Sequence, residues 1–364
     1  MRRTWRLLLS AFLLAILLPA CSSLGYYGQA VNGQLQLLAR RQPIDSLLEA
    51  ESTPADLRAR LALVRQLLDF AAQELALPVH DQYRSYVELD RPFVVWNVFA
   101  TPEFSMQPKT WCFPVAGCVA YRGWFSEARA RADARRLREA GFDVFVGGVA
   151  AYSTLGWFSD PVLSTVLYRE DHRLAMLLFH ELAHQVAYTR DDSVFNESFA
   201  TAVEQLGLAA WLAANEAQGG ESASERLAEL ARERELDAAF VALVQATAID
   251  LRQLYASGLE PDAMRAAKAA RIARLREEYA AARTAWGDAR YDAWFASEIN
   301  NARLSSVATY NTLVPAFEAL FAQCGGDWPC FHARAAGLAR LPRAERESTL
   351  QAVLEFSPSV TSTR

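Results

Sequence analysis

The chain has 364 residues, of which 52% are hydrophobic and 22% are charged. This composition excludes a disordered protein and allows one large domain, or two of ordinary size, around a substantial core. The net charge is −5, and Lys and Arg are scattered along the sequence rather than gathered into basic clusters. Because nucleic-acid binding relies on massed positive charge, no nucleic-acid partner is expected.

The N-terminus has the pattern of an export signal. Met1–Arg6 is basic, and the apolar run Leu7–Leu18 is too short to span a membrane as a permanent helix. The segment Leu18-Pro-Ala-Cys21 resembles a bacterial lipobox, which implies a signal peptide over residues 1–20 and acylation of Cys21. Several acyl chains hold a protein firmly, so we expect a lipid anchor in the bacterial cell envelope. The two serines after the cysteine favour the outer membrane, facing the periplasm; an ordinary cleaved signal or an uncleaved anchor is the alternative.

Helices are expected at the start of the mature chain. One runs from Gly25 to about Arg41, and a second begins near Gln42 with Asp45 or Ser46 as its cap. A third, over 52–75, has a proline in its first turn and apolar residues at helical spacing.

The next part of the chain is rich in β-branched and aromatic residues and predicts strands at 93–99, 117–124 and 142–152. An amphipathic helix at 126–140 lies between the last two. These segments predict a small sheet with a helix crossing it, and residues 151–160 would form an edge strand or the loop that leaves it.

The run Leu177–Val186 contains His180, Glu181 and His184 in HExxH spacing. An α-helix advances about 100° per residue, so the two histidines lie one turn apart on one face and both imidazoles can reach one ion. The pattern therefore predicts one Zn²⁺ per chain. Glu181 lies on a different angular face, from which it can act as general base on a water molecule beside the metal.

A catalytic zinc site usually has three protein ligands, so a third is sought downstream. Residues 195–207 predict a second helix that offers Glu197 and Glu204, seven residues apart on nearly the same face. A short connection lets the two helices run antiparallel, which places Glu197, near the start of the second, beside the histidines. Glu204 remains the other candidate, as a ligand or as a residue that contacts one, and Thr201 is a candidate to orient a ligating histidine.

From Leu208 to Phe321 the sequence is almost wholly helical, with breaks at 218–224 and 257–261. Apart from Cys21, four cysteines remain, as Cys112 with Cys118 and Cys324 with Cys330. In an oxidising compartment two short-loop disulfides are the simplest account of these two equal spacings, and a zinc site with four thiolates is the alternative.

The motif HELAHQ, followed by FNESFATAVEQLG, resembles the gluzincin metallopeptidases, and within them the aminopeptidase N pattern. The resemblance implies Glu197 as third ligand. The link departs from that pattern, since only twelve residues separate His184 from Glu197, whereas Glu204 would give nineteen, near the thermolysin spacing. Related enzymes take an oxyanion donor from the helical part after the ligands, which makes Tyr310 the candidate, ahead of His332 and Tyr152.

Two further stretches, 111–125 and 151–161, resemble a family of bacterial lipoproteins described as aminopeptidases. The resemblance implies a zinc aminopeptidase that hydrolyses peptides by direct attack of water. The chain lacks the Gly-x-Met-Glu-Asn element with which aminopeptidase N relatives hold a substrate amine. A zinc endopeptidase of the same fold, or a non-catalytic envelope protein organised by zinc, are therefore the alternatives.

The expected fold class is α+β and mostly helical, a gluzincin-like arrangement with a small sheet above the HExxH helix and a helical C-terminal half. Residues 21–165 would supply the N-terminal helices and the sheet, as the upper wall of a cleft. Residues 166–364 would supply the zinc-binding and C-terminal helices, and the two parts would form one continuous catalytic unit over 25–356.

Overall fold

The computed structural model describes residues 25–113, 117–154, 158–190, 192–307 and 312–355. It is 62% helical with small sheets, which confirms the α+β, mostly helical class. A helix over 25–39 comes first. The other helices are α2 (Ile44–Glu49), α3 (Ala55–Gln73), α4 (Glu127–Glu139), α5 (Ser164–Leu167), α6 (Asp171–Ala183), α7 (Ser193–Ala217), α8 (Ala223–Tyr255), α9 (Pro261–Trp286), α10 (Asp292–Ala296), α11 (Asn301–Ser306), α12 (Val314–Gln323), α13 (Trp328–Ala339) and α14 (Arg343–Glu355). The strands are β1 (Gln42–Pro43), β2 (Ser85–Val87), β3 (Val95–Pro102), β4 (Trp111–Phe113), β5 (Gly117–Val119), β6 (Tyr121–Trp124), β7 (Phe142–Val149) and β8 (Val162–Leu163).

The start of α2 differs from the prediction. Its N-cap is Pro43, and neither Asp45 nor Ser46 caps it, since the helix already includes Ile44. The reason is contact with residues distant in the sequence. Gln42 and Pro43 pair with β2 as strand β1, and Ile44 is buried in the core, so the sheet and the core fix where the helix begins.

The central sheet has the order β6-β3-β7, and both of its pairings are antiparallel. Small residues of α4, Ala130 and Ala134, pack with Trp96 and Val98 of β3 on one face. On the other side α11 contacts β3 and β7, and the buried side chain of Asn301 donates to carbonyls of the segment after β3. The predicted sheet and its crossing helix are therefore present, but the single strand predicted over 117–124 is divided, since β6 pairs with β3 in this sheet whereas β5 pairs with β4 in a separate hairpin.

Residues 151–154 and 158–160 form a loop, so the second of the two predicted alternatives is the correct one. The buried carboxylate of Asp160 explains the loop. It accepts hydrogen bonds from the amide and the hydroxyl of Thr154 and from the hydroxyl of Ser153, and these contacts fold the segment back on itself. The chain then enters β8, which pairs in parallel with β2, and continues through α5 into α6.

The largest core cluster is built around α3, α6 and α7 and extends from Leu37 to Val353. At Gly207, α7 packs closely against Leu75 and against Phe179 of α6. A Cβ there would lie 2.8 Å from Leu75 and 3.1 Å from Phe179, so a larger residue would displace these two side chains, and the close packing explains a glycine in a helix that it otherwise weakens. The helix predicted over 195–207 and the helical sequence predicted from Leu208 form one continuous helix to Ala217, so Gly207 is tolerated in its interior.

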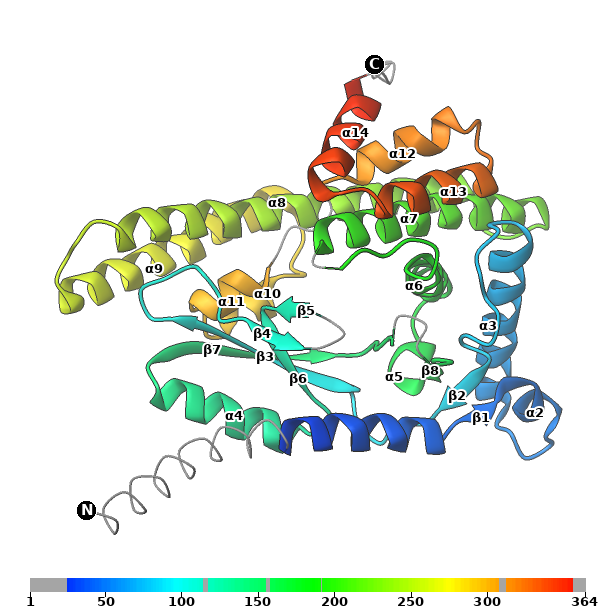
Figure 1. Ribbon diagram of the computed structural model, residues 1–364, viewed down its shortest axis with the longest axis horizontal. Coiled ribbons are helices and arrows are strands. Elements are labelled where there is room, and N and C mark those ends of the chain that lie inside the picture. Colours follow the sequence, from blue (N-terminus) through cyan, green and yellow to red (C-terminus); the bar gives the residue numbers. More distant parts are fainter. Residues whose placement is uncertain (1–24, 114–116, 155–157, 191, 308–311, 356–364) are drawn as a thin grey trace, which may run out of the picture.

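The helical C-terminal half consists of two groups of elements. Figure 1 shows α8 and α9 as a long antiparallel hairpin that extends away from the rest of the molecule, and α12, α13 and α14 stacked outside α7. The hairpin is held at the sheet by Lys268 of α9, whose ammonium lies 2.6 Å from Asp143 of β7. No helix in the described ranges has the length and hydropathy of a membrane span.

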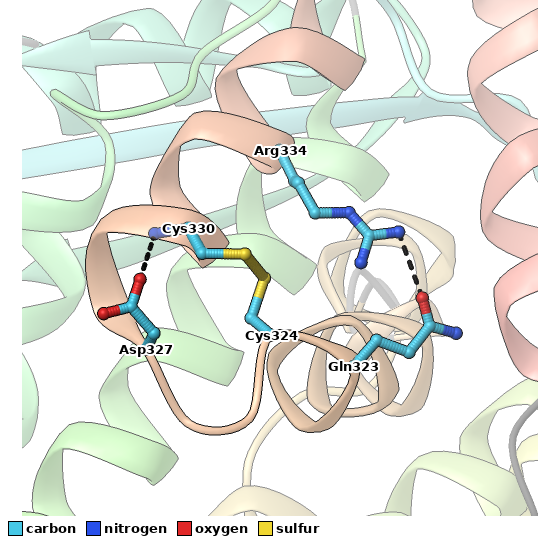
Figure 2. Close-up of a disulfide and its surroundings, with 5 residues drawn as sticks. All are labelled: Gln323, Cys324, Asp327, Cys330 and Arg334. Carbon is cyan, nitrogen blue, oxygen red and sulfur yellow. Dashed lines mark hydrogen bonds between the residues drawn. A yellow bond between two sulfur atoms is a disulfide. The ribbon is translucent and has the colours of Figure 1, made fainter.

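Both expected disulfides are present, Cys112–Cys118 across the β4–β5 hairpin and Cys324–Cys330 between α12 and α13. Figure 2 shows that two hydrogen bonds accompany the second bridge. Asp327 caps α13 by accepting from the amide of Cys330 at 2.8 Å, and Arg334 donates to Gln323 at 3.0 Å. The turn between the helices is thus fixed by polar contacts as well as by the bridge.

Replacing Cys324 and Cys330 together by Ser is expected to lower the free energy of unfolding by about 2 kcal/mol, the loop-closure value for so short a loop. Denaturant unfolding of the double variant measures this loss. Metal content should not change, because the bridge lies outside α7 on the side away from α6. A loss of bound metal would show that the bridge stabilises more than the turn between α12 and α13.

Candidate metal centre

α6 presents the HExxH residues on a helix that is anchored in the core. Leu178 and Leu182, four residues apart, are almost fully buried and fix its orientation. The imidazole rings of His180 and His184 lie with their centroids 4.9 Å apart on the neighbouring face. The helix ends at Ala183, but His184 keeps helical backbone angles at the C-cap position, so both rings remain on the same side.

The start of α7 is fixed against the end of α6 by side chains of the connecting loop. Asp192 is the N-cap of α7, and its carboxylate accepts a hydrogen bond from the backbone amide of Phe195 in the first turn. The amide side chain of Asn196 forms two hydrogen bonds of 2.8 Å with the backbone of Thr189. The carboxylate of Asp192 is also paired with Arg346 of α14, and both side chains are buried. This short, tied connection brings the first turns of α7, with Glu197, next to the histidines.

His180, His184 and Glu197 offer ligand atoms that all lie within 4.8 Å of one another, so the group could hold a metal ion. Nε2 of His180 is 3.4 Å from one oxygen of Glu197, and Nε2 of His184 is 3.8 Å from the other. Two imidazole nitrogens and one carboxylate oxygen form a donor set that suits Zn²⁺. The three residues named from the sequence are thus brought together.

The charges around this group are complementary to a cation. Burial alone would lower the pKa of His180, but hydrogen bonds to Glu197 and Glu204 and the charge of Glu181 raise it to about 10. Burial and the neighbouring charge of His180 lower the pKa of His184 to about 4. Burial opposes ionisation of Glu197, yet its contacts with the two histidines hold its pKa below the ordinary value. Acidic side chains from two helices therefore face the histidine pair, as expected of a site that receives a cation.

Glu204 lies beside the group rather than in it. Its carboxylate is 3.0 Å from Nδ1 of His180, the nitrogen opposite the one that faces Glu197. A carboxylate in this position accepts the Nδ1 proton, fixes the tautomer and leaves Nε2 free to bind a metal. Thr201, the other candidate for such a contact, is buried on α7 one turn after Glu197.

Glu181 points into a second polar group, formed with the loop after β7. The hydroxyl of Ser153 lies within hydrogen-bonding reach of Glu181, of the buried Tyr83 and of Asp160, whose carboxylate is 3.3 Å away, and its single proton can be donated to one of these groups at a time. Burial raises the pKa of Glu181; the charge of His180 opposes this, and the charge of Glu197 adds to it. A carboxyl whose pKa lies above the usual range is suited to accept and then return a proton.

Ser153 and Tyr83 were not anticipated as part of the site. Ser153 lies in the family-like stretch 151–161, which is the one sequence signal that pointed to its surroundings. Tyr83 carries no such signal. It has a φ of +60°, which is uncommon for a residue other than glycine, and such backbone angles occur often at functional sites.

The candidates for the oxyanion donor have different outcomes. Tyr310 lies outside the described residues. His332 is excluded, because it lies in α13 with Nε2 2.8 Å from the carbonyl of Leu75 and its ring against Phe199, as part of the core. Tyr152 lines a small cavity together with Glu181, so it remains near the site.

Comparison with known proteins places the chain in a family. No curated protein and no solved structure was found to match it. A family model described as "Putative aminopeptidase" matches residues 25–350, which confirms the resemblance to an aminopeptidase family and supports a peptidase activity in general. The match extends from the first described helix into α14 and so includes every residue of the metal group. The chain therefore belongs to this aminopeptidase family.

Proposed function

We propose that the protein is a zinc-dependent aminopeptidase of gluzincin type, with His180, His184 and Glu197 as ligands of one Zn²⁺. The observation that carries this proposal is the convergence of these three side chains within 4.8 Å, next to a fourth carboxyl, Glu181, that is free of the ligand set. The acidic side chains beside the histidine pair support a cation at this position, and the family match supports a peptidase. A purely structural site would have no use for Glu181.

When bound, Zn²⁺ supplies a Lewis acid that lowers the pKa of water and polarises a peptide carbonyl. Glu181 takes a proton from the attacking water and delivers it to the nitrogen of the leaving amine, so that the C–N bond breaks without a covalent enzyme intermediate. Ser153 holds the carboxyl of Glu181 in place by a hydrogen bond. Glu204 holds His180 through Nδ1.

Tyr310 remains our proposed donor to the oxyanion that forms on the substrate carbonyl. Support comes from its described neighbour in sequence, Leu313. The amide of Leu313 donates to the hydroxyl of Ser198 at 3.1 Å, and Ser198 directly follows Glu197. The chain three residues after Tyr310 is thereby fixed to the helix turn that carries a proposed ligand.

We further propose that the protein acts from a bacterial envelope membrane through lipid on Cys21, facing the periplasm, with peptides as its substrates. The helix over 25–39 follows closely after that cysteine. Its outer face carries three exposed apolar residues at four-residue spacing, Tyr27, Val31 and Leu35, and the first 44 residues contain no Asp or Glu. Such a face is compatible with a position close to an anionic lipid surface.

The proposal is tested with purified protein that starts after Cys21, by metal analysis and by hydrolysis of N-blocked and unblocked peptides. We expect about one zinc per chain and cleavage of unblocked peptides only, with activity abolished by a chelator and restored by Zn²⁺. Cleavage of both kinds of peptide would indicate the endopeptidase alternative. Bound zinc without turnover of either kind would support the non-catalytic alternative.

Glu204→Gln is expected to weaken zinc binding about 10- to 100-fold, the usual cost of losing a carboxylate that orients a ligating histidine. Gln keeps the shape of the side chain but accepts the Nδ1 proton without a negative charge. Competition with a chromophoric chelator measures the affinity. The matched control is Glu216→Gln, an exposed position on the same helix, which should retain full affinity. Equal affinities in the two variants would exclude Glu204 from this role.

A further inference from the structure

A small cavity adjoins the proposed general base. Its volume is about 20 Å³, and Glu181 forms part of its wall. Leu177 and Leu178 of α6, four and three residues before Glu181, form the adjoining wall. Apart from this carboxyl the lining is aliphatic or aromatic, with Tyr83 and Val166 among its members.

The cavity has an open side and a closed side. Tyr152, Leu177 and Glu181 are partly exposed, whereas Val166, at 5% exposure, and Leu178, at 2%, belong to the core. The exposed members therefore form the mouth and the buried members the floor. Glu181 is thus one of the lining residues that reach the solvent-exposed side of the cavity.

Elementary connectivity decides which part of a peptide reaches this mouth. Glu181 activates the water that attacks the substrate carbonyl, so the carbonyl carbon lies close to its carboxyl. The Cβ of the residue that owns this carbonyl is two bonds from the reacting carbon. The Cβ of the residue after the cleaved bond is three bonds away, across the amide nitrogen. The side chain on the carbonyl side is therefore the nearer one, and in an aminopeptidase it belongs to the N-terminal residue.

The volume limits what this side chain can be. On the order of 10–15 Å³ is needed to hold one water molecule, so 20 Å³ accommodates a group the size of a water molecule or a methyl group. A leucine or phenylalanine side chain is several times larger. The floor is made of fully buried core residues, and enlarging the cavity there would disturb close packing.

We infer that this cavity is the specificity pocket for the N-terminal residue of the substrate and that it selects small uncharged side chains, with alanine as the best fit. The inference rests on the proposed function, since it uses Glu181 as the general base. A charged side chain is excluded as well. Glu181 is the one charged residue among the described residues of the lining; it repels an anionic side chain, and a cationic side chain paired with it would occupy the general base.

The test uses the zinc-loaded mature chain and unblocked peptides that differ only in the N-terminal residue: Gly, Ala, Val, Leu or Phe. We expect kcat/KM for Ala to exceed that for Leu and for Phe at least tenfold, because methylene-sized differences in an apolar pocket are commonly worth this much. A second series varies the residue after the cleaved bond and should show a weaker dependence on size.

Leu177→Ala opens the mouth of the cavity and is expected to raise kcat/KM for Leu relative to Ala at least tenfold. Met176→Ala is the matched control, since Met176 neighbours Leu177 on α6 and does not line the cavity. Val166→Ala enlarges the floor and serves as a second variant; circular dichroism checks that each variant is folded.

The outcomes separate the two proposals. Faster cleavage after Leu or Phe than after Ala, or selection by size only at the residue after the cleaved bond, would overturn the pocket assignment and leave the aminopeptidase proposal standing. An unchanged order of substrates in folded Leu177→Ala and Val166→Ala would also overturn it. If the zinc-loaded chain cleaves none of the peptides, both proposals fail.

Discussion

Replacing Glu181 by Gln is expected to leave zinc binding intact and to reduce kcat for peptide hydrolysis about 10²- to 10⁴-fold, the usual contribution of a positioned general base. The physical reason lies in the geometry. The three candidate ligands are His180, His184 and Glu197, and Glu181 points instead toward Ser153 and the cavity. Gln fills the same space and can keep the hydrogen bond to Ser153, but it cannot take up a proton. Metal analysis and steady-state kinetics on the same preparation measure both parts of this prediction.

A matched control for this variant is Glu170→Gln, at the exposed N-terminal end of α6. It removes one negative charge from the same helix and should leave kcat unchanged. Survival of hydrolysis in Glu181→Gln would exclude Glu181 as the base. Loss of zinc in Glu181→Gln, with zinc retained in the control, would mean that Glu181 belongs to the ligand set.

The local part of the site could be predicted from sequence because it depends on helix periodicity. The HExxH spacing places two imidazoles on one face wherever the helix is, and the short link predicts that the next helix returns beside it. Spacing alone did not decide between Glu197 and Glu204, since both lie on nearly the same face of α7. The decision depends on which nitrogen of His180 each carboxylate meets, Nε2 for Glu197 and Nδ1 for Glu204.

The parts that could not be predicted depend on contacts between distant segments. Ser153 meets Glu181 only because Asp160 folds the loop after β7. His332, a candidate oxyanion donor from the sequence, belongs to the core, because α13 lies on the other side of α7 from α6 (Figure 1) and the imidazole contacts the carbonyl of Leu75. In each case the local sequence is compatible with several surroundings, and tertiary packing selects one.

The backbone near the metal group is also fixed by the C-terminal part of the chain, through the ion pair between Asp192 and Arg346. The two side chains are 6% and 4% exposed, and the guanidinium lies 2.5 Å from the carboxylate. The same guanidinium lies over the ring of Phe195, 5.0 Å from its centroid. Asp192 is the N-cap of α7, so one buried contact links α14 to the turn that precedes Glu197.

Arg346→Met is therefore expected to lower the free energy of unfolding by about 3–5 kcal/mol, because it leaves the carboxylate of Asp192 buried without its partner charge. Zinc affinity should fall as well, since the start of α7 is no longer fixed against α6. Arg131→Met is the matched control, because Arg131 lies in an exposed pair with Glu127 on α4, away from Asp192, and its replacement should cost less than about 1 kcal/mol. Denaturant unfolding with and without Zn²⁺ measures both effects.

Equal stabilities of the two variants would show that the ion pair does not fix the site. If the pair acts as argued, the double variant Asp192→Asn with Arg346→Met should recover part of the lost stability, because no unpaired charge then remains in the interior.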